Sequence, residues 1–478
     1  MTRQSKEERH RPRQYFILSL GCAKNMVDAR GMASLLERTG YRAVEAPSKA
    51  DLIIVNTCCF IEPAREESLA ALQRLAATKR PNQALLVAGC WPQRDAETIL
   101  TAVPEVDGLL GTRRWMDVPD VAQRLVGVED RDTVIHLPAA STVGQDEQGV
   151  PRVAIQGASA YLKIADGCSR ACAFCAIPFI KGPAVSRPPE RILEDVALLS
   201  RQGVKEIILI AQDTTAYGRD LGIEDGTAEL LERIVERVPE VAWIRLMYAF
   251  PGAVTPRLIE AMARHPQVLP YLDIPLQHAH PAVLQRMRRP ANMEWVRRTI
   301  ATMREQMPEM AIRTTFVVGY PGETEEEFAT LVNFAKEVTF DRVGVFTYSC
   351  EEGTEAAALR DDVSPELKED RRARLMKAQG PISLERNRAL VGRTLNVLIE
   401  GEGDGLSVGR SYRDAPEIDG LVLVEEQTPV GEMVSVRITR ALEHDLIGRL
   451  APPDHGSVKP DSPSSSLPKS GPGKEVVL

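Results

Sequence analysis

The chain has 478 residues, too many for one ordinary hydrophobic core, so we expect roughly two to four domains. Hydrophobic residues make up 44% and charged residues 26%, as is typical of soluble globular proteins. The formal net charge of −8 argues against a large nucleic-acid footprint and is compatible with a basic partner. Eight cysteines in so long a chain exclude a disulfide scaffold and favour metal or redox sites.

The chain contains no apolar run near the roughly 20 residues needed to span a bilayer, so no membrane association is expected. Residues 1–14 are charged, and no apolar segment of signal-peptide length follows them. We therefore expect a cytoplasmic protein. Residues 1–14 and the stretch 452–478, rich in Pro, Ser, Gly and Lys, are predicted to be disordered tails.

The N-terminal part alternates apolar strands with helices. A helix is predicted over 25–38, ended by Gly40, and another begins at Pro63, where the missing N–H costs little. This alternation predicts a parallel sheet with helices on both faces, in a domain over 15–128. The strands are expected at 15–20, 52–55 and 84–88.

Cys22, Cys58 and Cys90 each follow the carboxyl end of one of these strands, 36 and 32 residues apart. Sites in open α/β sheets form outside the carboxyl ends of the strands, so the three thiols can converge on one point. Cys59 is an ambiguity, because adjacent side chains point in different directions. The alternative is a set of unrelated cysteines buried in the sheet.

A polar segment over 127–158 is predicted to be a linker that contains a hairpin. Beyond it, strand and helix alternate six times, which predicts a partial, TIM-like (βα)6 barrel over 155–386. The strands are expected at 160–165, 205–211, 242–247, 270–274, 312–318 and 342–347, and the helices near 189–202, 225–237, 255–264, 291–306, 323–337 and 364–386.

The first barrel strand runs into Cys168, Cys172 and Cys175, a C-x3-C-x2-C motif, and Pro178 is expected to prevent a helix from starting early. Thiolates favour iron–sulfur clusters, zinc or copper(I). A 4Fe–4S cluster is normally held by four cysteines, so three would leave one iron open to react.

Other barrel strands end in polar residues, which in such barrels contact substrate or cofactor. For each of them, a turn or helix cap is an equal alternative. Thr324 is predicted to cap a helix with Glu327. His278 is either a ligand contact or a satisfied core histidine, and Cys350 is interpreted as structural.

Short strands at 395–399, 421–424 and 433–438 predict a small antiparallel β-barrel of the OB type over 388–451. Residues 391–450 hold six Arg and no Lys against seven Glu and four Asp, a formal charge of −5. A domain that binds RNA should be basic, so this negative charge favours a basic protein partner. The simpler alternative is an acidic face exposed to solvent.

Taken together, residues 15–451 resemble the radical S-adenosylmethionine (SAM) methylthiotransferases. The resemblance lies in the C-x3-C-x2-C motif, in the N-terminal segments 21–25, 56–58 and 88–90, and in a TRAM-like C-terminal barrel. In that family the residue after the second N-terminal cysteine is variable, which implies that Cys59 is not a ligand. Residues 409–420 resemble the branch that modifies small-subunit ribosomal protein S-twelve. The alternatives are the branch that modifies tRNA adenosine and, more distantly, a non-catalytic zinc-binding RNA adaptor.

The resemblance implies methylthiolation of an aspartate β-carbon with two 4Fe–4S clusters and SAM. One cluster would be held by Cys168, Cys172 and Cys175 and would bind SAM; the other, held by Cys22, Cys58 and Cys90, would carry the sulfur. An electron donor such as flavodoxin or ferredoxin is implied, and nucleic-acid contact is not expected to be primary. Candidate SAM contacts are Gln212, Gln277 and Arg313.

Overall fold

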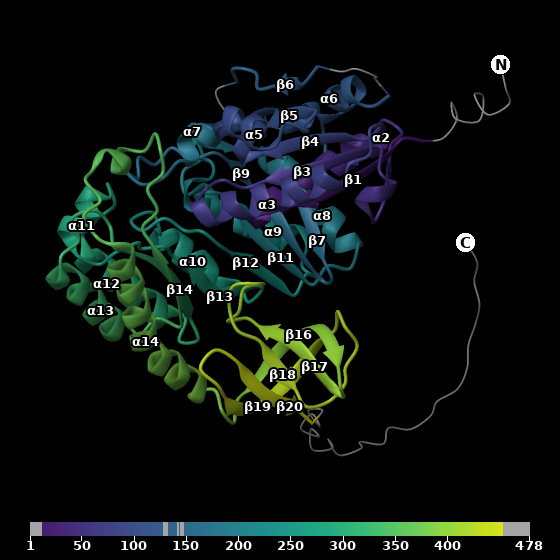
Figure 1. Cartoon of the computed structure of the whole chain (residues 1–478). Coiled ribbons are helices and arrows are strands. Elements are labelled where there is room, and N and C mark those ends of the chain that lie inside the picture. The colour runs from purple at the N-terminus through teal and green to yellow at the C-terminus, as the bar shows by residue number, and fades with distance from the viewer. Residues whose placement is uncertain (1–11, 128–131, 141–142, 144–147, 453–478) are drawn as a thin grey trace, which may run out of the picture.

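The computed structural model describes residues 12–127, 132–140, 143 and 148–452. An N-terminal α/β domain, a central partial barrel and a small closed β-barrel follow one another from top to bottom in Figure 1, which confirms the expected α/β fold class. The predicted tails, 1–14 and 452–478, lie outside the described residues except for 12–14 and 452. None of the described helices is both long and apolar enough to cross a membrane.

The N-terminal sheet is entirely parallel, in the order β2-β1-β3-β4-β5-β6. It extends beyond the predicted boundary at 128, because β6 pairs with β5. Its strands are β1 (Gln14–Ser19), β2 (Arg42–Ala43), β3 (Leu52–Thr57), β4 (Ala84–Gly89), β5 (Gly108–Gly111) and β6 (Val134–His136).

Helices cover both faces of this sheet. All residues of β3 and β4 are buried, as is typical of parallel strands that are covered on both sides. Leu52 and Ile54 belong to the apolar cluster on one face, whereas Ile53 and Val55 belong to the cluster on the other. As predicted, the first helix ends just before Gly40, whose φ is +89°. The helices are α2 (Ala23–Arg38), α3 (Glu62–Thr78), α4 (Cys90–Arg94), α5 (Ala96–Ala102) and α6 (Val118–Leu125), with 3-10 turns η2 (Pro47–Lys49) and η3 (Thr112–Asp117).

The central sheet contains the six expected parallel strands and does not close on itself. A seventh strand, β7 (Val153–Gln156), pairs antiparallel with the first of them, so the hairpin expected in the linker is part of this sheet. The parallel strands are β8 (Ser159–Lys163), β11 (Glu206–Ile210), β12 (Trp243–Leu246), β13 (Val268–Asp273), β14 (Ala311–Val318) and β15 (Arg342–Thr347).

Six helices match the predicted set, and Thr324 caps α13 as expected: its Oγ1 accepts from Glu327 N at 3.2 Å, and Glu327 Oε2 accepts from Thr324 N at 3.0 Å. Pro178 does not delay a helix, because it lies in the first turn of the short α7 (Ile177–Lys181), where its N–H is not needed. The six helices are α8 (Pro189–Arg201), α9 (Gly226–Arg237), α10 (Pro256–Arg264), α12 (Met293–Gln306), α13 (Glu325–Val338) and α14 (Pro365–Arg388). Short elements that were not predicted are α11 (Pro281–Arg286), β9 (Ala165–Asp166), β10 (Val185–Ser186), and the 3-10 turns η4 (Thr214–Ala216), η5 (Arg219–Leu221) and η6 (Glu355–Ala358).

The C-terminal module is a closed five-stranded barrel, in which two strands, β17 and β20, were not predicted. The expectation of a purely antiparallel barrel is wrong for one pair. β19 and β20 form a hairpin, and closure of the barrel then brings β20 beside β18 in the same direction. The strands are β16 (Thr394–Gly403), β17 (Leu406–Ser411), β18 (Val422–Val424), β19 (Met433–Ala441) and β20 (Leu446–Leu450).

Buried ion pairs fix this module to the central barrel. Arg410 Nη2 donates to Glu206 Oε2 at 2.6 Å, and Arg342 Nη2 donates to Asp414 Oδ1 at 2.6 Å. These four side chains are all nearly inaccessible to solvent. Residues 409–420, singled out in the sequence, therefore form much of the contact between the two barrels.

Candidate active site

The three N-terminal cysteines are brought together by the carboxyl ends of β1, β3 and β4, which are neighbours in the sheet. Gly21 has φ +86°, and a Cβ there would lie 2.5 Å from Cys58 Cβ, so only glycine allows the loop before Cys22 to approach Cys58 so closely.

Asn25, on the first turn of α2, ties these three loops to one another. Its Nδ2 donates to Thr57 O at 3.0 Å and to Leu20 O at 3.1 Å. Its Oδ1 accepts from Cys90 Sγ at 3.7 Å.

The protein environment acts differently on these three thiols. Burial raises the pKa of Cys58, helped by the nearby Cys22, and burial raises the pKa of Cys90 well above its ordinary value. Burial also disfavours ionisation of Cys22, but the charges of Lys24 and Lys181 and hydrogen bonds from backbone N–H groups together outweigh it and lower the pKa of Cys22. Metal binding requires thiolates, so a bound cation would have to ionise Cys58 and Cys90.

The barrel cysteines lie on the loop between β9 and α7, at the carboxyl end of β8. Gly167, with φ +71°, allows the loop to pass against Pro183, whose carbonyl oxygen would lie 2.0 Å from a Cβ. The backbone N–H of Cys168 donates to Gly182 O at 3.0 Å, which holds the start of the loop. Burial raises the pKa of Cys168 and raises that of Cys175 to about 12.

All six cysteines line one cavity of about 420 Å³ between the N-terminal domain and the barrel. The rest of its wall is largely apolar, with Phe60, Ile61, Phe174, Ile177 and Ile180 among the lining residues. Within the described residues, no three His, Cys, Asp or Glu side chains converge closely enough to hold one metal ion. The cysteines of an iron–sulfur cluster bind different irons and do not have to meet at one ion. The donor set in each triplet, thiols without carboxylates, fits such a cluster.

Three charged side chains surround the barrel triplet. Arg289 Nη1 lies 3.6 Å from Cys172 Sγ, and Arg170 Nε donates to Asp213 Oδ2 at 2.7 Å. Both guanidinium groups lie over the ring of Phe250, 4.3 Å and 3.9 Å from its centroid. The loop is therefore in a positively charged environment, which suits the negative charge of thiolate ligands.

Two of the three predicted SAM contacts lie in this cavity. Gln212 and Gln277 line it, and Gln212 Oε1 is buried with no hydrogen-bond partner in the described structure. Arg313 lies outside the lining: its guanidinium pairs with Asp273 at 2.9 Å and with Asp419 at 3.3 Å. Arg313 is the third residue of β14, away from the carboxyl end of the strand, and the sequence could not reveal that it helps to bind the C-terminal module.

The remaining ambiguous residues lie outside the cavity lining. His278 is a buried core histidine: its Nδ1 accepts from His280 N at 3.0 Å, and burial lowers its pKa. Cys59 is buried in the apolar cluster on the sheet face that α3 covers. Cys350 is exposed, and its interpretation as structural stays a prediction.

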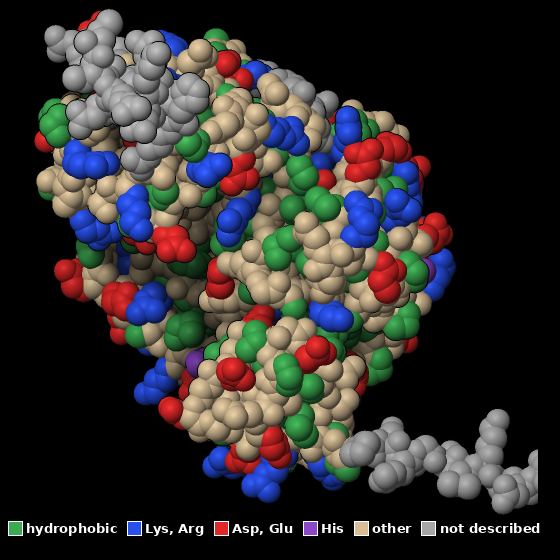
Figure 2. Space-filling view, turned by 90° about the vertical axis from the view of Figure 1, so that its right-hand side faces the viewer, with side chains coloured by type: hydrophobic (Ala, Val, Ile, Leu, Met, Phe, Trp, Pro, Cys, Tyr) green, Lys and Arg blue, Asp and Glu red, His purple; other side chains and the backbone are tan. Residues whose placement is uncertain are grey.

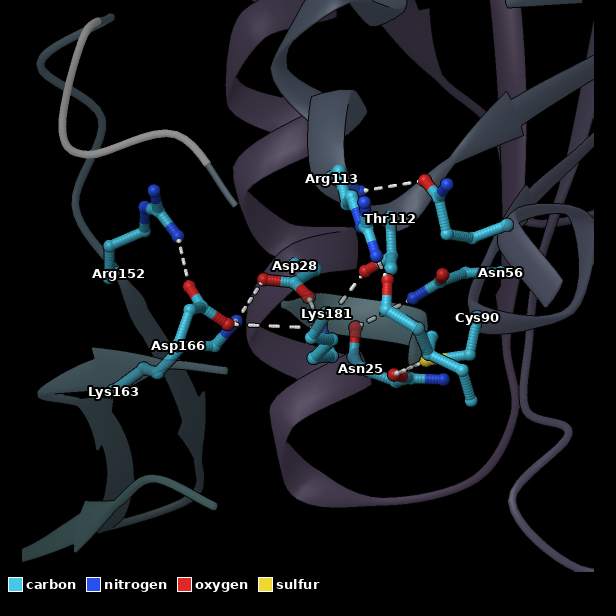
Figure 3. A network of polar contacts seen from close by, with 12 residues as sticks. Asn25, Asp28, Asn56, Cys90, Thr112, Arg113, Arg152, Lys163, Asp166 and Lys181 are labelled. Atoms are coloured by element: carbon cyan, nitrogen blue, oxygen red, sulfur yellow. Dashed lines mark hydrogen bonds and ion pairs between the residues drawn. The ribbon is translucent and has the colours of Figure 1, made fainter. Parts of the chain in front are cut away.

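A buried network of charges joins the N-terminal domain to the barrel next to the cavity (Figure 3). Asp28, on α2, pairs with Lys163 of β8 and, at 3.3 Å, with Lys181 of α7. Lys181 also donates to Thr112 Oγ1 at 2.9 Å and lines the cavity. Burial disfavours its charge, but the surrounding acidic groups, Asp28 first and Asp166 among them, together outweigh this effect and raise the pKa of Lys181.

Sequence reasoning missed several of these lining residues. Lys24 and Asn25 lie in the motif around Cys22, so their position offered a signal. Arg170 lies inside the barrel cysteine motif and Asp213 follows the second barrel strand, so their positions offered a signal too. Lys181, Tyr248 and Arg289 carried no such signal, because their partners are distant in the chain.

Comparison with known families supports the reading of each part of the chain. Residues 14–111 match the uncharacterized protein family UPF0004, residues 162–335 the radical SAM superfamily and residues 391–451 the TRAM domain. A solved radical S-adenosylmethionine methyltransferase, TsrM from Kitasatospora setae, has the same fold over 77% of this chain and 89% of its own, with a TM-score of 0.54 at 14% identity. The cavity and fold are thus those of a radical SAM enzyme, a class that uses SAM and a 4Fe–4S cluster.

Curated relatives define the family more closely. The chain is 47% identical over 464 residues to the "Ribosomal protein uS12 methylthiotransferase RimO" of a Roseiflexus species, covering 92% of this chain and 98% of the relative. It is also 47% identical over 451 residues to the protein of that name in Chloroflexus aurantiacus, covering 91% and 99%. The chain belongs to this RimO family of radical SAM methylthiotransferases.

Proposed function

We propose that this enzyme attaches a methylthio group to small-subunit ribosomal protein uS12, at the β-carbon of an aspartate. The family relationship supports the substrate, since the relatives carry uS12 in their name. The observation that carries the chemistry is the single cavity lined by two cysteine triplets from two different sheets. A reaction that joins a carbon and a sulfur needs both reacting groups in one water-poor space.

Each triplet is proposed to hold a 4Fe–4S cluster and to leave one iron open. Cys168, Cys172 and Cys175 are assigned to the cluster that binds SAM, and Cys22, Cys58 and Cys90 to the sulfur-carrying one. When bound, these groups supply radical chemistry at an unactivated carbon, which no side chain can supply.

Other residues of the cavity wall are proposed to balance thiolate charge, to bind SAM and to exclude water. Arg289 balances thiolate charge at Cys172, and the unpartnered amide oxygen of Gln212 is available to accept a hydrogen bond from SAM. The apolar wall around Phe60 and Phe174 limits the access of water.

These assignments divide the work among the three predicted domains. Sulfur transfer is assigned to 15–128, radical generation to 155–386 and substrate binding to 388–451. We further propose a flavodoxin- or ferredoxin-like electron donor and a cytoplasmic location, where ribosomal proteins are made and assembled.

The acidic C-terminal module supports a basic protein substrate over tRNA. The side chains of Arg410, Arg413, Asp414 and Asp419 are buried against the barrel; these two positive and two negative charges cancel, so the remaining charge of residues 391–450 is still −5. On the face shown in Figure 2, acidic side chains lie over this module at the bottom, and basic side chains lie beside acidic ones along its lower edge. A module that binds nucleic acid would need a net positive charge.

The zinc-adaptor alternative is less well supported. A structural zinc site is closed by four ligands around one ion, and the described residues offer no group of three that could hold one ion.

Mass spectrometry of uS12 from cells that lack this enzyme tests the proposal, with complementation by the wild type, by Cys168→Ala and by the exposed control Cys350→Ala. We expect the methylthio mass to be absent from the aspartate in the deletion strain. The wild type and Cys350→Ala should restore it, whereas Cys168→Ala should not. A modified tRNA adenosine together with unmodified uS12 would show that the tRNA alternative is correct.

A further inference from the structure

Lys24 is a buried cation in the cavity that has no carboxylate partner of its own within the described residues. Its side chain lies on the first turn of α2, two residues after Cys22, and only 8% of the residue is exposed. It lines the cavity, and its Nζ lies 3.2 Å from the centroid of the Tyr248 ring. Within the described residues, no hydrogen bond or ion pair to a carboxylate is formed by this ammonium group.

The other cations of the cavity wall form hydrogen bonds or ion pairs, although Arg170 Nη2 and Arg289 Nε are buried without an acceptor in the described structure. Arg170 pairs with Asp213 at 2.7 Å, and Lys181 with Asp28 at 3.3 Å. Arg289 contacts Cys172 Sγ at 3.6 Å and donates to the carbonyl oxygen of Pro275. Among the described lining residues, Lys24 is the cation whose side chain forms no hydrogen bond or ion pair. It lies beside Cys22, whereas Arg170 and Arg289 lie at the barrel triplet.

A buried ammonium group is costly unless an anion or hydrogen-bond acceptors compensate it. The face of an aromatic ring compensates only part of this cost. The position of Lys24 thus favours a ligand that brings a negative charge into the cavity.

Tyr248 keeps the ammonium group at this place. It follows the end of β12 and has a φ of 62°, in the left-handed region that bulky residues rarely adopt. Such backbone strain is held only where the surrounding structure enforces it, and it is concentrated at functional sites. The strained backbone presents the ring to Nζ of Lys24 across the boundary between the two domains.

We propose that Lys24 binds the side-chain carboxylate of the target aspartate and is thereby a specificity-determining residue. This inference rests on the function proposed above. The β-carbon of an aspartate is bonded directly to its carboxylate carbon, so a cation that binds the carboxylate also fixes the reacting carbon. Because Lys24 lies next to Cys22, the carbon is then held beside the triplet assigned to sulfur transfer. Adenine carries no such anion, so the same contact discriminates against a tRNA base.

Binding of two peptides to cluster-reconstituted protein tests this proposal. One fluorescent peptide carries the uS12 segment with the target aspartate, and the other carries asparagine at that position. We expect the wild type to bind the aspartate peptide about ten- to a hundredfold more tightly, as a charge-assisted hydrogen bond in a dry site does. Lys24→Met should bind both peptides equally, Lys24→Arg should keep part of the preference, and the exposed control Lys49→Met should keep all of it.

The outcomes separate this proposal from the one on which it rests. If the wild type binds neither peptide and does not modify uS12, the proposed function itself fails. If the wild type modifies uS12 but Lys24→Met keeps the preference for aspartate, only the role of Lys24 is overturned. A loss of iron in Lys24→Met with the preference intact would likewise overturn it, by showing that Lys24 serves Cys22.

A second pair of variants keeps the test independent of cluster assembly. Tyr248→Phe retains the ring and should keep the preference for the aspartate peptide. Tyr248→Leu removes the ring that holds Nζ and should reduce the preference severalfold. Equal preference in both variants would contradict the positioning role of the ring.

Discussion

Lys181 Nζ lies 3.3 Å from Asp28 Oδ2, and this buried contact joins α7 of the barrel to α2 of the N-terminal domain. Asp28 also pairs with Lys163, and none of the three side chains is more than 4% exposed. The carboxylate therefore compensates, together with Asp166, two buried ammonium groups at the wall of the active cavity.

Replacing Asp28 by Asn should leave two buried cations with too little negative charge. We expect the free energy of unfolding of the cluster-free protein to fall by about 3–5 kcal/mol, as for other broken buried ion pairs. Urea unfolding under reducing conditions measures this change. Asp404→Asn, in an exposed turn where asparagine tolerates the φ of 52°, is the matched control and should have little effect. Equal stability of both variants would contradict the role of Asp28.

The contact between the two barrels should be sensitive to acid. Burial disfavours the charge of Glu206, but Arg245 and Arg410 outweigh it and lower its pKa from 4.5 to about 2. A group whose pKa is lowered by folding stabilises the protein above its unfolded pKa, and the stabilisation is lost as the pH falls toward the folded pKa. The wild type should therefore lose about 2 kcal/mol from this group between pH 5 and pH 3, because each pKa unit corresponds to about 1.4 kcal/mol.

Glu206→Gln isolates this effect from the titration of other groups. The variant should be less stable at pH 7, and its difference from the wild type should shrink as the pH falls from 5 to 3. Urea unfolding of the cluster-free proteins at several pH values gives both quantities. A difference that does not depend on pH would show that Glu206 is not the group that titrates.

The two cysteine triplets should be separable by mutation. Wild-type protein reconstituted without oxygen should contain about eight irons per chain, and Cys22→Ala and Cys168→Ala about four each. Cys168→Ala should lose SAM cleavage, whereas Cys22→Ala should retain it without forming product. Iron and sulfide analysis, with chromatography of 5′-deoxyadenosine, measures these quantities. About eight irons should remain in Cys350→Ala, and methylthiolated product from Cys22→Ala would contradict the assignment.

The two glutamines of the cavity should contribute to SAM binding. Gln212→Ala removes the unpartnered amide oxygen, and Gln277→Asn shortens the side chain while tolerating the φ of 73°. Each change should weaken SAM binding about tenfold, the worth of one hydrogen bond in a dry site. Equilibrium dialysis with reconstituted protein measures the affinity. The exposed control Lys49→Met should bind SAM like the wild type.

Much of the architecture was predictable because parallel strands place their carboxyl ends at one edge. Cys22, Cys58 and Cys90 are distant in the chain, yet their positions after three buried strands were enough to predict one site. The structure brings them to a common cavity with the barrel cysteines. The periodic helices of the barrel were likewise found within a few residues.

The residues and strands that were mispredicted or missed are those whose partners are distant in the chain. Arg313 looked like a cofactor contact because it lies in a barrel strand, but its partners are Asp273 and Asp419. Lys181 and Asp28 lie in different domains, and no local pattern relates them. β17 was overlooked because Gly409 and Arg410 interrupt its apolar pattern, and Arg410 is buried only because Glu206 of another domain neutralises it.

The buried pairs between the two barrels also limit how this protein can be re-engineered. Glu206, Arg342 and Asp341 have little or no access to water, and each has a partner in the C-terminal module. A module transplanted from a tRNA-modifying relative would have to bring its own matching charges, or the partial barrel would be left with buried groups unpaired. Exchanging substrates by exchanging this module therefore requires coordinated changes in the barrel strands, so the substrate-holding part and the radical-generating part are constrained to evolve together.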